Sequence, residues 1–198
     1  AGLGEEDLDP AVAVALAEAE RHGPDAVRRA PIAAPQVGGR VVRDDRGELL
    51  GEPRGAGGLG LEALSRGAAQ VILVECNREH CEYINRNLAK VCKAMGEQPG
   101  IGAPQVVQAD VRQAPIILAA VQPDLILADP PYHQDSTGFG AAHLLNDENL
   151  AQWAGHGCLL VLEHAADAAL PWHPASPWQL LKNKRFGNRA VSFARLAS

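Results

Sequence analysis

Short apolar runs alternate with helical patterns from residue 55 onward, and this alternation limits the possible folds more than any other feature. The apolar runs cover residues 71–74, 105–108, 125–128 and 158–162. Candidate helices cover residues 59–66, 78–95, 111–120 and 146–154. Strands that alternate with helices are typical of βα units around a parallel sheet. The sequence therefore predicts an α/β, Rossmann-like fold with a mostly parallel sheet and helices on both faces.

The two ends of the chain differ from this pattern. Residues 178–184 and 189–196 read as two strands joined through residues 185–188, which predicts a C-terminal antiparallel hairpin. Alanine-rich residues 10–22 predict a short amphipathic helix, and residues 40–42 and 48–50 are candidate short strands within a stretch broken by proline and glycine. We expect residues 1–54 to form an N-terminal lead-in and residues 55–198 to form the main domain.

Composition sets outer limits on the class of protein. A chain of 198 residues with 46% hydrophobic content can bury one α/β core. It contains no uninterrupted apolar stretch of the roughly 20 residues needed to span a bilayer, and its acidic first residues lack the basic start of a secretory signal, so we expect a cytoplasmic protein and no membrane association. The cysteines and histidines lack ligand-like spacing, so no metal is expected.

The formal net charge of −6 argues mildly against a nucleic-acid partner, because such proteins usually carry a basic face. The main local exception is the basic run of residues 182–185, followed by Arg189 and Arg195. Such a run is more often a solvated hairpin than a nucleic-acid contact.

A glycine-rich segment precedes the first of the expected helices. Gly55, Gly57 and Gly60 match the spacing GxGxxG, in which glycines allow a tight turn and close approach of a ligand to the backbone. Glu75 ends the next apolar run and could accept hydrogen bonds from both ribose hydroxyls of a nucleoside, although an exposed carboxylate at a strand end is the alternative. Together these residues predict an adenosine-containing cofactor.

Asp110 and Val111 follow the next expected strand, at the sheet edge where ligands bind in open parallel sheets. The Asp110 carboxylate could accept a hydrogen bond from an adenine amino group. It could equally cap the helix that starts near Val111, and the sequence leaves both possibilities open.

The tetrapeptide Asp129-Pro130-Pro131-Tyr132 directly follows a buried run and is the most informative motif. An exocyclic base amine is a weak nucleophile, because its lone pair is delocalised into the ring. The Asp129 carboxylate and the Pro130 carbonyl could accept its two N–H groups and draw the nitrogen toward tetrahedral geometry. Pro131 would keep the turn rigid and Tyr132 would stack on an unpaired base. The alternative is a turn in which these residues occur by chance.

With these motifs in place, the sequence resembles the RsmD-like methyltransferases, which modify a guanine N2 of bacterial small-subunit ribosomal RNA. The resemblance covers residues 55–193 and rests on the segments Gly55–Ala68, Val74-Glu75, Asn85–Leu88, Leu127–Tyr132, Val161–His164, Phe186-Gly187 and Ala190–Phe193.

The resemblance implies S-adenosylmethionine as the methyl donor. Its methionine end would lie near the glycine segment, its ribose on Glu75 and its adenine near Asp110 and Val111. It also implies ribosomal RNA as partner, and the acidic charge favours an assembled small-subunit particle over naked RNA; we expect the protein itself to be a monomer. The family usually has an acid-containing turn before the second glycine, whereas this chain has Gly51-Glu52-Pro53-Arg54.

Two other functions remain open from the sequence. An NAD-dependent oxidoreductase would share the glycine segment and Glu75, but gives Asp129–Tyr132 no role. A catalytically weak relative that binds a partner through the same scaffold would account for the divergent residues ahead of Gly55.

Overall fold

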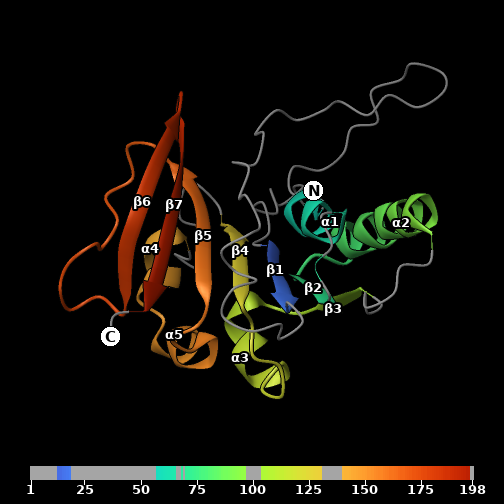
Figure 1. Ribbon diagram of the computed structural model, residues 1–198, viewed down its shortest axis with the longest axis horizontal. Coiled ribbons are helices and arrows are strands. Elements are labelled where there is room, and N and C mark those ends of the chain that lie inside the picture. The colour runs from blue at the N-terminus through green and yellow to red at the C-terminus, as the bar shows by residue number, and fades with distance from the viewer. Residues whose placement is uncertain are drawn as a thin grey trace, which may run out of the picture.

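The computed structural model describes residues 13–18, 57–65, 68, 70–96, 104–130 and 140–196. Its strands form one sheet in the order β3-β2-β1-β4-β5-β7-β6 (Figure 1). The strand bounds are β1 (Ala13–Glu18), β2 (Gln70–Glu75), β3 (Gln105–Gln108), β4 (Leu125–Asp129), β5 (Leu159–Ala165), β6 (Trp178–Phe186) and β7 (Arg189–Leu196). All the strands expected after residue 55 are therefore present, with the C-terminal hairpin as predicted.

The described helices are α1 (Gly58–Ser65), α2 (Arg78–Met95), α3 (Ala114–Ile117), α4 (Ala141–Leu145) and α5 (Glu148–Ala154), with a 3₁₀ turn over Val111–Gln113. The bounds of α2 are those the sequence predicts. The helix expected over residues 111–120 is shorter and divided, because Pro115 has no N–H to donate to the carbonyl of Val111. The Ala114 N–H donates to that carbonyl in a tighter turn, and α3 begins there. None of the described helices is long and apolar enough to cross a membrane.

Side chains of β2 alternate between two cores, one on each face of the sheet. Val71 and Leu73 pack with residues of α1 and α2, whereas Ile72 and Val74 pack with residues of α3, α4 and α5. Figure 1 shows α1 and α2 on the right beside β2, α3 at the lower centre, and α4 and α5 on the left. This arrangement confirms the prediction of an α/β fold with helices on both faces.

The helix predicted over residues 10–22 is wrong where the structure describes this segment, because Ala13–Glu18 form strand β1. This strand lies between β2 and β4 and is antiparallel to both, with Val14 opposite Val74 and Ala13 opposite Asp129. Its backbone is therefore hydrogen-bonded on both sides, which outweighs the helical preference of alanine. The candidate strands at residues 40–42 and 48–50 lie outside the described residues.

Strand direction determines which residues meet at each edge of the sheet. Strands β2 and β4 both run opposite to β1, so they are parallel to each other, and β3 and β5 are parallel to them in turn. Strand β7 runs antiparallel to β5, and β6 antiparallel to β7. The carboxyl ends of β3, β2, β4 and β5 therefore lie along one edge, which also receives the start of β7. This edge, which we call the carboxyl edge, carries the candidate site.

Candidate functional site

Asp129 is the last residue of β4 and is half-buried at the carboxyl edge, and the buried Pro130 follows it. The pKa of Asp129 is raised to about 6, mainly by burial; the charge of Glu163 contributes to this rise and that of Arg189 opposes it. The Asp129 carboxylate is therefore mainly ionised, and able to accept hydrogen bonds, only above about pH 6. Pro131 and Tyr132 lie outside the described residues.

Glu163 and Arg189 form a charged pair next to Asp129 that the sequence did not single out. Nη1 of Arg189 donates to Oε1 of Glu163 at 3.2 Å, and their side chains are 44% and 11% exposed. The pair joins β7 to β5. Glu163 lies near the end of a buried strand, as do Glu75 and Asp129, and this shared position was the signal that could have identified it.

Glu75 ends β2 at the same edge, and its residue surface is only 1% exposed. Its Oε1 accepts a hydrogen bond from the backbone N–H of Asn77 at 2.7 Å, and its Oε2 lies 3.6 Å from Nδ1 of His80. Burial raises the pKa of Glu75, and the hydrogen bond from Asn77 and the neighbouring His80 oppose this rise. The alternative of an exposed carboxylate at a strand end is therefore wrong.

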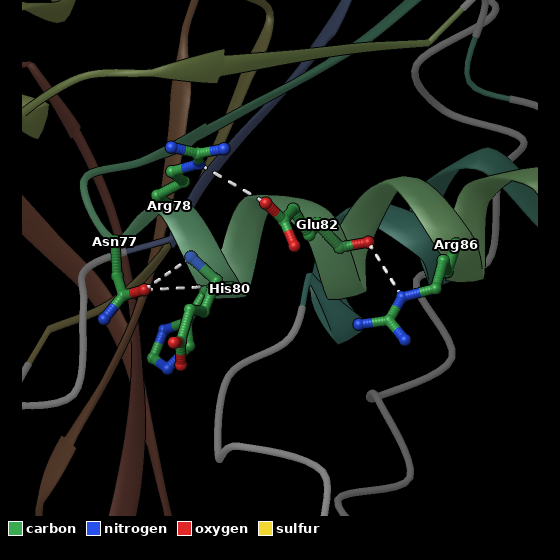
Figure 2. Close-up of polar contacts among 6 residues, drawn as sticks. Asn77, Arg78, His80, Glu82 and Arg86 are labelled. Carbon is green, nitrogen blue, oxygen red and sulfur yellow. Dashed lines mark hydrogen bonds and ion pairs between the residues drawn. The ribbon is translucent and has the colours of Figure 1, made fainter.

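The N-cap residue of helix α2, Asn77, fixes the start of the helix beside Glu75. Oδ1 of Asn77 accepts hydrogen bonds from the N–H groups of Glu79 and His80, at 2.8 and 3.2 Å (Figure 2). This cap fixes His80 in the first turn, within reach of Glu75. Along the exposed side of the helix, Arg78 pairs with Glu82, and Arg86 donates to the carbonyl of Glu82 (Figure 2). The contacts that hold Glu75 therefore come from the start of α2.

Gly57 shows why the glycine segment needs glycine. Its φ is +76°, and a Cβ there would lie 2.8 Å from Cδ2 of Leu73 and 3.1 Å from Cγ1 of Ile84. The turn thus lies against Leu73 of β2, two residues before Glu75. The Gly57 carbonyl accepts the N–H of Leu61 in the first turn of α1. Gly60 is buried within α1. Gly55 lies outside the described residues.

Asp110 follows β3 and caps the 3₁₀ turn that begins at Val111, which is buried. Its Oδ1 accepts the N–H of Arg112 at 2.9 Å, and both of its oxygens contact the Arg112 guanidinium. Hydrogen bonds from the Arg112 side chain hold the pKa of Asp110 below its usual value. The capping role expected as one of two possibilities is therefore present.

The described residues fit an adenosine cofactor in two respects. The Gly57 turn brings bare backbone against β2, and the adjacent strand end supplies the buried carboxylate of Glu75. A carboxylate offers about four acceptor positions, which suits a pair of ribose hydroxyls. Within the described ranges, no group of three or more potential metal ligands occurs.

The structure thus brings Glu75, Asp110 and Asp129 to one edge of the sheet, at or just beyond the carboxyl ends of β2, β3 and β4. These three strands run in the same direction, and β1 lies between β2 and β4. In open α/β sheets, ligands bind outside the carboxyl ends of the strands. The arrangement can hold a nucleoside at β2 and β3 and present an acceptor pair at the end of β4.

The chain is similar to known proteins in both sequence and structure. The profile of the family described as conserved hypothetical protein 95 matches residues 45–195. Ribosomal RNA small subunit methyltransferase D from Escherichia coli (strain K12) is 30% identical over 136 residues, which cover 69% of this chain and 62% of that protein. The chain therefore spans less than two thirds of the length of this relative.

Solved structures show the same fold. A conserved hypothetical protein from Streptococcus pyogenes superimposes with a TM-score of 0.55 at 23% identity, over 72% of this chain and 81% of the other. The proposed methyltransferase yhhF from Escherichia coli gives 0.52 at 28% identity over 72% of each chain. The proposed methylase HI0767 from Haemophilus influenzae gives 0.50 at 26% identity over 73% and 83%.

The resemblance expected from the motifs is confirmed by these matches and by a shared mixed α/β fold with a C-terminal antiparallel strand pair. The chain belongs to the family described as conserved hypothetical protein 95, and its sequence is similar to that of ribosomal RNA small subunit methyltransferase D.

Proposed function

We propose that this protein is an S-adenosylmethionine-dependent methyltransferase that acts on an exocyclic base amine of small-subunit ribosomal RNA, with guanine N2 as the target atom. Family membership and the name of the Escherichia coli relative support the reaction class. The observation that carries the proposal is that Asp129 lies at the carboxyl edge of the sheet, where Glu75 also lies.

Asp129 and Pro130 supply the two acceptors for the amine. The carboxylate of Asp129 and the carbonyl of Pro130 accept one N–H each and hold the nitrogen lone pair toward the methyl group. Acceptors that strengthen as positive charge develops on nitrogen favour the transition state over the ground state. The amine proton passes to water after transfer, since the methylated nitrogen is far more acidic than the starting amine. Pro131 and Tyr132 complete the motif, with Tyr132 as the stacking platform for the base.

The cofactor lies along β2 and β3 in this proposal. S-adenosylmethionine supplies an electrophilic methyl group when bound. Glu75 accepts the ribose hydroxyls, and the glycine segment at Gly55, Gly57 and Gly60 leaves room for the methionine end. Asp110 and Val111 lie where the adenine would be, although the Asp110 oxygens are already engaged by Arg112.

The net charge of −6 favours an assembled small-subunit particle as substrate, since ribosomal proteins there would add contacts that this chain lacks. A cytoplasmic monomer acting on such particles is the arrangement we propose.

The test incubates the protein with S-adenosylmethionine labelled in the methyl group and with small-subunit particles that lack the modification. Mapping of the labelled nucleotide by nuclease digestion and mass spectrometry should give one N2-methylguanine in the RNA. The Asp129→Ala variant serves as the inactive control. Label on another atom would exclude guanine N2, and no label on particles, RNA or DNA would exclude the reaction itself.

A further inference from the structure

The β6–β7 hairpin has two chemically different faces. Cross-strand partners in an antiparallel pair of strands lie on the same face of the sheet. One face of the hairpin carries the pairs Lys182 with Phe193, Lys184 with Val191 and Phe186 with Arg189. The opposite face pairs Asn183 with Ser192 and Arg185 with Ala190, and it continues into the core beside α4 and α5 through Ala194.

One face therefore collects most of the positive charge of the hairpin. Lys182, Lys184 and Arg189 lie on it, with Arg195 farther along the same side of β7, and we call these four residues the cationic face. Residues 168–198 contain no aspartate or glutamate, although the whole chain has a net charge of −6. Glu163 pairs with Arg189 at one end of this face, and the other three cations still form a basic patch on an acidic protein, which is the electrostatic pattern of a polyanion contact.

The cationic face extends to the carboxyl edge of the sheet. Arg189 is opposite Ala165 and Val191 is opposite Glu163, so the hairpin turn lies at the end of the sheet where Asp129 and Glu163 stand. Alternation along the paired strands places Asp129, Glu163 and Arg189 on one face of the sheet. Figure 1 shows the β6–β7 turn reaching beyond the ends of β4 and β5.

An exposed aromatic ring lies at the tip of the same face. Phe186 is 41% exposed, shares its face with Lys184 and lies directly before the turn at Gly187, whose φ is +62°. Cationic side chains with an interleaved aromatic ring suit RNA, because lysines contact phosphates without sequence preference while the ring stacks on an unpaired base. An acidic protein surface would not use the ring in this way.

We propose that the cationic face of the β6–β7 hairpin binds the phosphate backbone of the RNA substrate and guides the target base toward Asp129. The inference rests on the proposed function for the identity of the RNA. RNA binding and methyl transfer are measured separately, so the inference and the proposed function can be refuted independently of each other.

The test compares neighbouring residues on opposite faces. Lys184→Gln and Arg185→Gln each remove one positive charge, but only Lys184 belongs to the cationic face; a third variant combines Lys182→Gln with Lys184→Gln. Affinity for small-subunit ribosomal RNA, both free and in small-subunit particles that lack the modification, is measured by anisotropy of the fluorescently labelled protein over a series of salt concentrations. Thermal unfolding of each variant checks that the hairpin is intact.

We expect the double variant to bind the RNA at least about fivefold more weakly than the unmodified protein, with the slope of log affinity against log salt reduced by about one for each lysine. The Arg185→Gln variant should bind within about twofold of the unmodified protein. Phe186→Leu should weaken binding with the salt slope unchanged, because stacking releases no counterions.

Equal losses in Lys184→Gln and Arg185→Gln would overturn the inference, since they would reflect net charge alone. Unchanged affinity in the double variant would also overturn it, as would failure of the unmodified protein to bind the RNA. RNA binding that depends on the two lysines without any methyl transfer would instead refute the proposed function and leave the cationic face as an RNA contact.

Discussion

The Arg189 guanidinium on β7 donates a hydrogen bond to the Glu163 carboxylate on β5, with Nη1 and Oε1 3.2 Å apart. Both residues act electrostatically on Asp129, and they act in opposite directions. The negative charge of Glu163 raises the pKa of Asp129, and the positive charge of Arg189 lowers it. Burial is the main cause of the raised pKa of Asp129, and the pair adjusts that pKa in both directions.

Replacement of each partner should move the acid limb of methyl transfer in opposite directions. Glu163→Gln removes a negative charge, so the pKa of Asp129 falls and activity persists to lower pH. Arg189→Gln removes a positive charge, so the pKa rises and activity is lost at higher pH. The measurement is kcat against pH at saturating RNA, which separates this effect from weaker RNA binding in the Arg189 variant. Shifts of the same sign in both variants would contradict the assignment.

Methyl transfer by the unmodified protein should decline as the pH falls through about 6, because a protonated Asp129 carboxyl is a weaker acceptor for the N–H that it holds, while Pro130 still accepts the other. The Asp129→Asn variant should transfer methyl groups at least about 100-fold more slowly at every pH. A rate in this variant close to that of the unmodified protein would remove Asp129 from the mechanism.

The same substitution should make the fold more stable at neutral pH. The pKa of Asp129 is raised in the folded protein from 3.8 to about 6, so the stability that this group contributes is fully present below pH 4 and is lost as the pH rises through 6. Asparagine does not titrate. The free energy of unfolding of the Asp129→Asn variant should therefore rise relative to that of the unmodified protein as the pH increases from 4 to 7.5. We expect this relative gain to be about 1–2 kcal/mol, allowing for partial exposure of the side chain. Urea unfolding at pH 4 and at pH 7.5 measures the stability difference between the variant and the unmodified protein. The same difference at both pH values would contradict the prediction.

Cofactor affinity should depend more on Glu75 than on Asp110. Glu75→Gln keeps an oxygen for the Asn77 N–H but removes the carboxylate, so affinity for S-adenosylmethionine should fall by at least about tenfold. Asp110→Ser keeps the N-cap, and it should have a smaller effect because the Asp110 oxygens already contact Arg112. Isothermal titration calorimetry compares the two variants. A larger loss in the serine variant would indicate that Asp110 is the main nucleoside ligand.

Two adjacent glycines should respond differently to alanine. Gly57→Ala places a Cβ 2.8 Å from Leu73 at a φ of +76°, and should destabilise the fold by about 2–4 kcal/mol. Gly58→Ala meets no atom within 4 Å and should change stability by less than about 0.5 kcal/mol. Chemical denaturation measures both variants. Similar values would mean that the turn can move away from β2.

The sequence predicted those parts of the molecule in which local pattern and tertiary packing agree. The four apolar runs became strands, α2 has the predicted bounds at Arg78 and Met95, and the hairpin closes the sheet as expected. The motif residues Glu75 and Asp129 could be placed at one edge because the carboxyl ends of parallel strands must meet there. For these elements, the periodicity of the apolar residues was sufficient.

Other features depended on contacts between distant segments. Residues 13–18 have the alanine content of a helix, but they form β1 because a position between β2 and β4 satisfies both of their backbone edges. Whether Glu75 would be exposed or buried was open until α2 brought His80 against it.

By itself, the sequence determined the α/β class, the order of most elements and the chemical types available at the strand ends. Tertiary structure alone decided that Glu163 and Arg189 stand beside Asp129, and that lysines 182 and 184 share a face with them. The physical reason is that side-chain periodicity is local, whereas the pairing of β4, β5 and β7 depends on which strands become neighbours in the sheet.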